Sequence, residues 1–328
     1  MKTSKMRRLC LTAGLAGLLA GRALALAPES YPNPGQPLKL VVPFPAGGTT
    51  DILARMIAQK LEEAWGQPIL VENKPGAGGT VGNAFVVKSP PDGHTLLIGI
   101  SSLVQQPWLM DKLSYDPLKD LLPVAMIARS TNRLVVPLAS PAKDLRQFIA
   151  MVKAGPDKYS FGSYGVGTLS HLQGALLNMQ AGIDLVHVPF QGGGPLVTNL
   201  IGGQVASAFV DIGNALPHLK SLRPLAVVGA ERAPGLPEVP TFAESGYHSL
   251  DRYGWFGVFL PAATPGPVVR KLADEIDRIV HMPELTARFE GMGLQAGVGK
   301  PEEFQNTVRA DAALYGRIIR DANIRLTP

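Results

Sequence analysis

The sequence predicts an α/β protein made of two lobes joined by a two-strand hinge. Short apolar runs alternate with helical patterns along the chain, which is typical of largely parallel sheets covered on both faces. The chain has 328 residues, of which 46% are hydrophobic, and this is enough for two domains with sizeable cores. Two strands bounded by proline, at residues 133–136 and 257–260, indicate places where the chain crosses between the lobes.

The first predicted strand, at residues 38–42, is a continuous apolar run that stops at Pro43 and Pro45. The other predicted strands are short runs of the same kind, separated by turn residues. In chain order they lie at residues 69–71, 95–100, 159–163, 185–189, 206–211 and 224–229.

Helices are predicted where apolar residues recur at spacings of three and four. Gly155-Pro156 ends one of them, and Thr264-Pro265 starts another. The apolar faces are Leu53, Met56, Ile57 and Leu61 in a helix at about 50–65; Leu145, Phe148, Ile149 and Val152 at 144–154; Val268, Leu272, Ile276 and Ile279 after residue 264; and Phe304, Val308, Ala312, Tyr315 and Ile319 in a C-terminal helix.

The excess of positive charge is confined to the N-terminus. Residues 1–25 hold five cations and no acid, so the formal net charge of +5 leaves the rest of the chain balanced. Cys10, the only cysteine, lies in the same segment, which excludes a disulfide scaffold and a cysteine-based zinc site. A chain without clustered cations also gives no reason to expect nucleic-acid binding.

Residues 1–25 have the pattern of a secretory signal peptide. A basic start is followed by an apolar stretch at residues 9–21 and by Ala23-Leu24-Ala25, a small-x-small cleavage pattern. The apolar stretch would make roughly 20 Å of helix, too short for a hydrocarbon core of about 30 Å. We expect cleavage after Ala25 and export to the periplasm. The remaining chain is predicted to form a discontinuous first lobe (26–130 plus 257–328) and a second lobe (131–256).

A glycine-rich turn, PFPAGGTTD at residues 43–51, follows the first strand and opens a helix. Glycines let backbone N–H groups approach a ligand, and the helix N-terminus adds a positive dipole, so this turn is a candidate anion site. The alternative is that Thr49, Thr50 or Asp51 caps the helix. Capping explains these polar residues, but it does not require the adjacent Gly47 and Gly48.

Two further glycine-rich turns follow strands. KPGAGGTVG at residues 74–82 is close to a dinucleotide fingerprint, but Val81 stands where the third glycine should be. We interpret it as a structural turn and expect neither NAD nor another cofactor. FGSYGVGTLSH at residues 161–171 opens a helix in the second lobe. Two helix starts that face each other across a cleft would suit a carboxylate, because ligands in this fold class bind at the carboxyl ends of the strands.

Patterns for catalysis or metal binding are poor. Phe161 stands where a nucleophile elbow around Ser163 needs glycine. Ser170 and His171 are neighbours on a helix and do not face each other. The six histidines show no paired metal-ligand spacing. We predict no catalytic residue and no metal site, and an exported serine hydrolase using Ser163 or Ser170 is the alternative function.

Several segments resemble a known family. They are VVPFPAGGTTDILARMIAQKL (41–61), VENKPGAGGTVGNAFVVKSPPDGHTLLIG (71–99), FGSYGVGTLSHLQGALL (161–177), VHVPFQGGGP (186–195), LRPLAVVGAERAPGLPEVPTFAESGY (222–247) and WFGVFLPAATP (255–265). In their order and spacing, the chain resembles the Bug family of extracytoplasmic solute receptors, which are associated with tripartite tricarboxylate transporters. The resemblance covers essentially the whole chain after the signal.

This resemblance implies a type II periplasmic-binding-protein fold that closes on a small carboxylate: a di- or tricarboxylate, an acidic amino acid or an aromatic acid. The first glycine-rich turn would hold one carboxylate through backbone N–H groups, and the second-lobe turn would approach the same group. Asp211 would read the distal part of the ligand. The implied binding residues are Phe44, Ala46, Gly47, Gly48, Thr49, Thr50, Ser101, Ser102, Ser163, Gly167, Thr168, Ser170 and Asp211.

Two departures from the family pattern remove charge near the distal part of the site. Ala206 stands where many relatives have Asp, and Phe190-Gln191 replaces a frequent Tyr-Lys pair. Together, the signal peptide, the glycine-rich turns and the resemblance lead us to expect a non-catalytic, monomeric periplasmic receptor. It would bind a small organic acid and deliver it to inner-membrane transporter subunits. Backbone dipoles rather than an arginine clamp would hold the anion.

Overall fold

The structure is a computed structural model that describes residues 31–110, 112–190, 193–211, 215, 218–233, 235–248, 250, 252–297 and 300–324. The predicted signal peptide and its cleavage after Ala25 lie outside the described residues, as does Gln191 of the Phe190-Gln191 departure.

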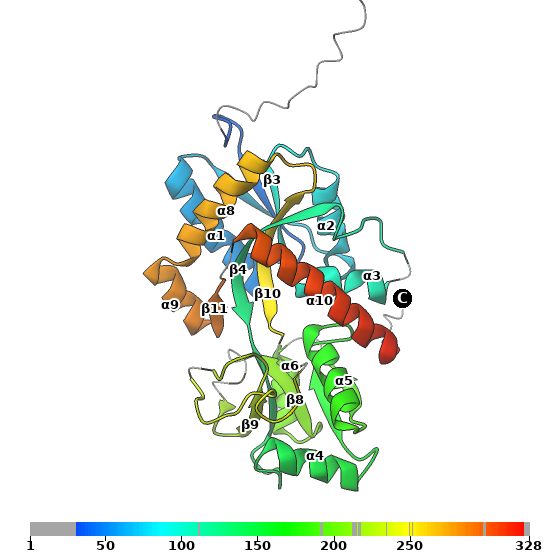
Figure 1. The fold of residues 1–328 in the computed structure, drawn as a ribbon. Helices are drawn as coiled ribbons and strands as arrows, with labels where there is room; N and C mark the ends of the chain where they lie inside the picture. The colour runs from blue at the N-terminus through cyan, green and yellow to red at the C-terminus, as the bar shows by residue number, and fades with distance from the viewer. Residues whose placement is uncertain are drawn as a thin grey trace, which may run out of the picture.

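A six-stranded sheet forms the upper lobe in Figure 1, with the strand order β11-β4-β10-β3-β1-β2. β1, β2 and β3 are parallel, whereas β10 runs antiparallel to both β3 and β4. The strands are β1 (Leu38–Val42), β2 (Ile69–Asn73), β3 (Thr95–Ile100), β4 (Leu121–Ser130), β10 (Gly254–Pro261) and β11 (Leu294–Ala296).

A five-stranded sheet forms the lower lobe, with the order β7-β6-β8-β5-β9. β6 is parallel to β7 and β8, and β5 is antiparallel to β8 and β9. The strands are β5 (Asn132–Pro137), β6 (Ser160–Ser163), β7 (Val186–Pro189), β8 (Ser207–Asp211) and β9 (Leu222–Val227).

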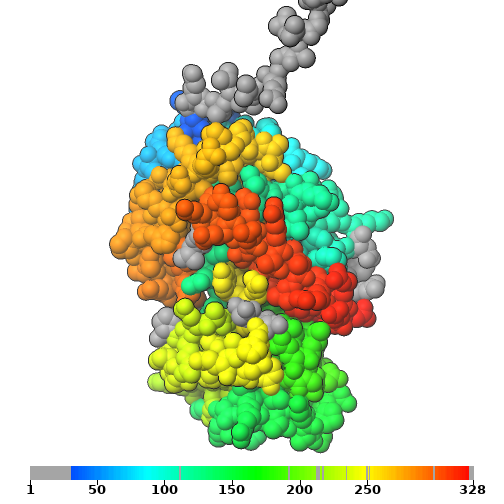
Figure 2. Space-filling model, viewed as in Figure 1, coloured from blue at the N-terminus to red at the C-terminus, as the bar shows by residue number. Residues whose placement is uncertain are grey.

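Helices cover both sheets, as the periodicity predicts. The first lobe carries α1 (Thr49–Trp65), α2 (Thr80–Val87), α3 (Gln106–Leu109), α8 (Gly266–Val280), α9 (Pro283–Gly291) and α10 (Pro301–Asp321), with short 3₁₀ turns η1 (Ala77–Gly79) and η2 (Ser101–Val104). The second lobe carries α4 (Leu145–Ala154), α5 (Leu169–Ala181) and α6 (Gly193–Ile201). α10 packs on the first lobe and also contacts α5 of the second, and its red C-terminal end lies against the green part of the second lobe in Figure 2.

The chain passes between the lobes next to the centre of each sheet. β4 ends at Ser130 and β5 begins at Asn132, so Thr131 alone separates the two sheets on the outward path. The chain returns through the segment before Gly254, where β10 enters the first sheet. The two-lobed α/β fold class is thus confirmed. The strands predicted to cross between the lobes, residues 133–136 and 257–260, each lie wholly inside one sheet, so the chain crosses just before each of them. The lobe boundaries at 130/131 and 256/257 stay a prediction.

Several strands differ from the prediction: β11 was not predicted, and β10 begins before the expected residue 257. For β4 and β9, proline explains the difference. β4 was not predicted, because Pro123 interrupts its apolar run. In the structure β11 pairs only with the end of β4, so at Pro123 the strand has β10 as its one neighbour and the missing N–H breaks no ladder hydrogen bond on the other side. β9 spans Leu222–Val227 instead of 224–229. It accommodates Pro224 because β9 is an edge strand, and it ends before Gly229, whose φ is +142°.

The predicted apolar helix faces form the core. In α1, Leu53, Ile57 and Leu61 are fully buried, and Met56 packs at the edge of the cluster. A second apolar cluster contains side chains from both lobes, including Phe304 of α10 and Leu172 of α5. In the described part of the chain, no helix combines the length and apolar character needed to cross a membrane.

Candidate functional site

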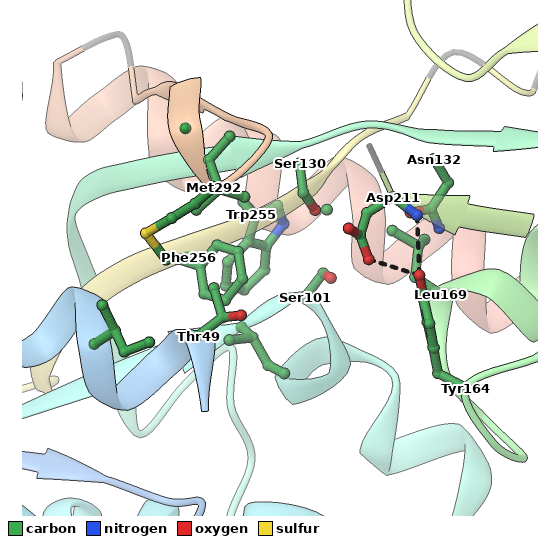
Figure 3. A pocket seen from close by; sticks show the side chains of 15 residues that line it. Thr49, Ser101, Ser130, Asn132, Tyr164, Leu169, Asp211, Trp255, Phe256 and Met292 are labelled. Atoms are coloured by element: carbon green, nitrogen blue, oxygen red, sulfur yellow. Dashed lines mark hydrogen bonds between the residues drawn. The ribbon is translucent and has the colours of Figure 1, made fainter. Parts of the chain in front are cut away.

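A cleft of about 500 Å³ lies between the two lobes, a size suited to a small ligand. Figure 3 shows its two walls, one from each lobe. The first lobe supplies Thr49, Ile52, Ile100, Ser101, Ser130, Gly254, Trp255, Phe256, Gly291, Met292 and Leu294, and the second supplies Asn132, Tyr164, Leu169 and Asp211.

The N-terminus of α1 forms part of the first wall. Gly48 is the N-cap residue in an extended conformation, and no side chain caps the helix, so the capping alternative for Thr49, Thr50 and Asp51 is wrong. The first N–H groups of a helix have no acceptor within it. Because Thr49 lines the cleft, these donors and the positive end of the helix dipole lie at its wall.

Asp51 holds the preceding turn in place. Its carboxylate accepts hydrogen bonds from the Gly47 N–H (2.9 Å), from Arg55 (3.0 Å) and from the Asn73 amide (3.0 Å). Asn73 also donates to the Phe44 carbonyl at 3.1 Å. The hydrogen bonds from Arg55 lead the effects that lower the pKa of Asp51 to about 2, so the carboxylate stays charged. The Gly47 N–H is therefore occupied, while Gly48 and the helix start stay accessible.

The second glycine-rich turn supports the first. A Cβ at Gly79 would lie 3.3 Å from the Phe44 ring, and one at Gly82 would lie 2.8 Å from the Pro43 side chain and 2.9 Å from the Lys74 carbonyl. These glycines allow η1 and α2 to pack directly against the first turn. This packing agrees with our interpretation of residues 74–82 as a structural turn.

Ser101 and Ser130 lie where the cleft meets the hinge. Ser101 begins η2 directly after β3 and lines the cleft, whereas the neighbouring Ser102 is half-buried and does not. A Cβ at Gly254 would lie 2.8 Å from the Ser130 hydroxyl oxygen and 3.7 Å from that of Ser101. Glycine at this position therefore leaves both hydroxyls open to the cleft.

The second-lobe turn presents residues other than those predicted. Ser163 and Ser170 have no exposed surface. The Ser170 hydroxyl accepts a hydrogen bond from the Tyr164 N–H (3.0 Å), and the Thr168 hydroxyl donates to the Gly165 carbonyl (2.7 Å). These contacts fold the turn, with Gly167 at a φ of +74°. As a result Tyr164 and Leu169, which the sequence did not single out, line the cleft.

Tyr164 and Asp211 form a bonded pair on the second wall. The Tyr164 hydroxyl donates to the Asp211 carboxylate at 2.6 Å, and the Asp211 N–H donates to the Tyr164 oxygen at 2.9 Å (Figure 3). Arg133 lies behind them with 2% of its surface exposed. Burial lowers the pKa of Arg133 to about 10, and the charge of Asp211 acts in the opposite direction. Asp211 thus lines the cleft, and its role in reading the ligand stays a prediction.

Two histidines support the same turn from behind. The rings of His171 and His187 stack with centroids 3.6 Å apart and an interplanar angle of 5°. His171 Nδ1 accepts from the Gly167 N–H (3.1 Å), and His187 Nε2 lies 2.7 Å from the Ser163 hydroxyl oxygen. Burial lowers the pKa of both histidines to about 4. Ser163 has no exposed surface and neither Ser163 nor His187 lines the cleft, so their contact serves the turn and gives no support to a hydrolase.

The aromatic residues at the return of the chain also form the first wall. Near the predicted return crossing, Trp255 and Phe259 are core residues with 1% and 0% of their surface exposed, whereas Phe256 is half-buried. Phe256 and the edge of the buried Trp255 line the cleft. Trp255 donates its indole N–H to Asp311 of α10 at 2.8 Å and packs edge-on against Phe304. The sequence feature that could have pointed to these aromatic residues is their position next to the predicted crossing strand at residues 257–260.

Three of the thirteen implied binding residues line the cleft: Thr49, Ser101 and Asp211. The remainder build the turns that carry the lining residues. In the part of the chain that the structure describes, no group of three or more His, Cys, Asp or Glu side chains could hold a metal ion.

Two lobes of α/β structure with a ligand-sized cleft between them define the class of periplasmic-type solute-binding receptors. The chain belongs to the tripartite tricarboxylate transporter family of receptors, whose family model matches residues 53–324.

Solved structures agree with this assignment. The chain is similar to an R. palustris protein solved with adipate (32% identity, TM-score 0.76, covering 89% of this chain and 99% of that one). It is similar to MatC of Rhodopseudomonas palustris with bound malate (32% identity, TM-score 0.72, 88% and 100%). It is also similar to the periplasmic binding protein BugD (29% identity, TM-score 0.73, 90% and 100%).

Proposed function

We propose that this protein is a non-catalytic periplasmic receptor that binds a small organic carboxylate in the cleft between its lobes. The observation that carries the proposal is the uncapped N-terminus of α1 in the cleft wall, because free helix N–H groups and the helix dipole bind anions. Relatives with bound adipate and malate support the ligand class.

In this proposal the first turn (Phe44, Ala46, Gly47, Gly48, Thr49 and Thr50) and Ser101 with Ser102 form the half-site of the first lobe. The turn residues Ser163, Gly167, Thr168 and Ser170 position Tyr164 and Leu169 of the second lobe, beside Asp211. Closure would bring the half-sites together around the ligand, with the connections beside Thr131 and Gly254 changing their dihedral angles. The closed, monomeric receptor would then present the ligand to membrane subunits of a tripartite transporter, and the signal segment would direct export.

Thermal unfolding with a panel of mono-, di- and tricarboxylates tests the function. A ligand at concentration L that binds only the folded state adds RT ln(1 + L/Kd) to the free energy of unfolding, and so raises the melting temperature. In the Gly48→Leu variant this shift should vanish, with Kd at least about tenfold weaker. A Cβ at Gly48 has no neighbour closer than 3.9 Å, so the fold should tolerate the side chain while it covers the helix N–H groups.

Gly194→Leu is the matched control, because Gly194 lies in α6 away from the cleft and a Cβ there would meet open space. It should keep the ligand-induced shift. A panel in which no acid raises the melting temperature of the parent protein would contradict carboxylate reception.

A further inference from the structure

Charge on the cleft wall is sparse and negative. Among the described residues that line the cleft there is no Lys, Arg or His, and Asp211 is the single charged side chain. The remaining polar groups are neutral hydroxyls and one amide, that of Asn132, which donates to Gln173 at 2.7 Å. Such a wall offers one anion site, at the start of α1, and no cation for a second.

Three arginines on elements next to the cleft serve other contacts. Arg133 is buried behind the second wall and donates to the Thr131 carbonyl at 3.0 Å. Arg129 lies over the Tyr253 ring, 5.2 Å from its centroid, and lines a separate small cavity. Arg55 is paired with Asp51. Neither Arg133, Arg129 nor Arg55 is a lining residue of the cleft.

Much of the first wall is apolar. Phe256 presents ring surface, and Met292, the C-cap residue of α9, adds aliphatic surface (Figure 3). Trp255 and Leu294 lie behind them, with 1% and 5% of their surface exposed. The indole N–H of Trp255 is engaged by Asp311, so the ring offers no hydrogen bond to a ligand in the cleft. A second carboxylate against this wall would lose water without gaining a partner.

We propose that the cleft selects acids that carry a single carboxylate on an apolar or aromatic body, and that it discriminates against dicarboxylates. This rests on the proposed function. The carboxylate binds at the α1 N-terminus, the body packs on Phe256 and Met292, and a neutral hydroxyl at the far end donates to the Asp211 carboxylate. A charge-assisted hydrogen bond rewards such a hydroxyl, whereas a second carboxylate there meets a like charge.

Isothermal titration with two matched pairs tests this selectivity. Hexanoate and adipate share a six-carbon chain, and 4-hydroxybenzoate and terephthalate share a ring; in each pair only the second acid has two carboxylates. We expect the monocarboxylate of each pair to bind at least tenfold more tightly. The proposal is overturned if adipate binds as tightly as hexanoate, if terephthalate binds as tightly as 4-hydroxybenzoate, or if neither monocarboxylate binds. The proposed function falls only if no acid of the wider panel binds.

The Asp211→Asn variant tests the cause. Asparagine can still accept the hydrogen bond from Tyr164, so the second wall should keep its shape. The affinity ratio of hexanoate to adipate should fall at least fivefold, because the repulsion is removed. Asp144→Asn, at the N-cap of α4 in the second lobe, removes the same charge away from the cleft and should leave the ratio unchanged. An unaltered ratio in Asp211→Asn overturns the role given to this charge.

Discussion

Asp51 shows how one side chain prepares the binding turn at the scale of the single residue. It is 3% exposed and joins Gly47, Arg55 and Asn73. Asp51→Ala should lower the free energy of unfolding by about 1–3 kcal/mol, since it leaves the Gly47 N–H and the half-buried Asn73 amide without their buried acceptor. Urea denaturation measures this change. Ligand affinity should fall with it, because the turn before α1 loses its anchor.

Glu63→Ala is the control on the same helix. Glu63 pairs with Lys60 on the surface of α1, and exposed ion pairs contribute little to stability. If Asp51→Ala were no more destabilising than Glu63→Ala, the Asp51 network would have no role in holding the turn.

The stacked pair of His171 and His187 makes stability depend on pH. Their folded pKa of about 4 lies below the ordinary value of 6.5, so the unfolded chain takes up protons first as the pH falls. The contribution is fully present above about pH 6.5 and is lost as the pH falls from 6.5 towards 4, by at most ~1.4 kcal/mol per histidine for each pH unit.

Denaturant titrations across this pH range measure that slope. In a His187→Asn variant the slope should become shallower, because one of the two protonations is removed. Ligand binding should weaken over the same pH range, since His171 accepts a hydrogen bond from the Gly167 N–H in the glycine-rich turn of the second lobe. An identical slope in the parent and the variant would show that other groups cause the pH dependence.

At the scale of the element, the packing of α5 on β6 depends on Gly174. A Cβ at this position would lie 2.0 Å from the Phe161 ring. Alanine favours a helix by about 1 kcal/mol over glycine, but overpacking of a core costs about 1–3 kcal/mol. We expect Gly174→Ala to be destabilising in thermal or urea unfolding, because Phe161 is itself fully buried and cannot move aside freely.

Gly194→Ala in α6 makes the same substitution in a helix without a steric conflict. It should be neutral or stabilising by up to about 1 kcal/mol. Equal effects of the two substitutions would mean that the contact between Gly174 and Phe161 is relieved by a small shift of the helix.

At the scale of the whole molecule, the two lobes should move towards each other when a ligand binds. No cysteine occurs after Cys10, so spin labels can be placed without background, for example through Glu63→Cys on α1 and Lys153→Cys on α4. We expect the distance between the labels to shorten when a binding acid is added. If the distance between the two labels were the same with and without ligand, closure of the lobes on the ligand would be contradicted. A pair of labels on α1 and α8, both in the first lobe, serves as the control.

Local patterns predicted most of the fold. Strands such as Thr95–Ile100 and helices such as Thr49–Trp65 follow from periodicity and from the prolines and glycines that bound them. β4 was missed because a proline is tolerable only where a neighbouring strand is absent, and the absence of a neighbour is a property of the whole sheet.

Local patterns were enough to predict the two-lobed α/β class, a helix at about residues 50–65 and the charge balance of residues 26–328. The tertiary structure alone decided which side chains meet in the cleft. It turned Ser163 and Ser170 inward, placed Tyr164 beside Asp211, and brought Trp255 to the wall opposite them. The difference lies in the sequence separation of the residues involved. Periodicity and helix ends depend on neighbouring residues, whereas the cleft brings together segments more than a hundred residues apart, and their packing leaves no local pattern in the sequence.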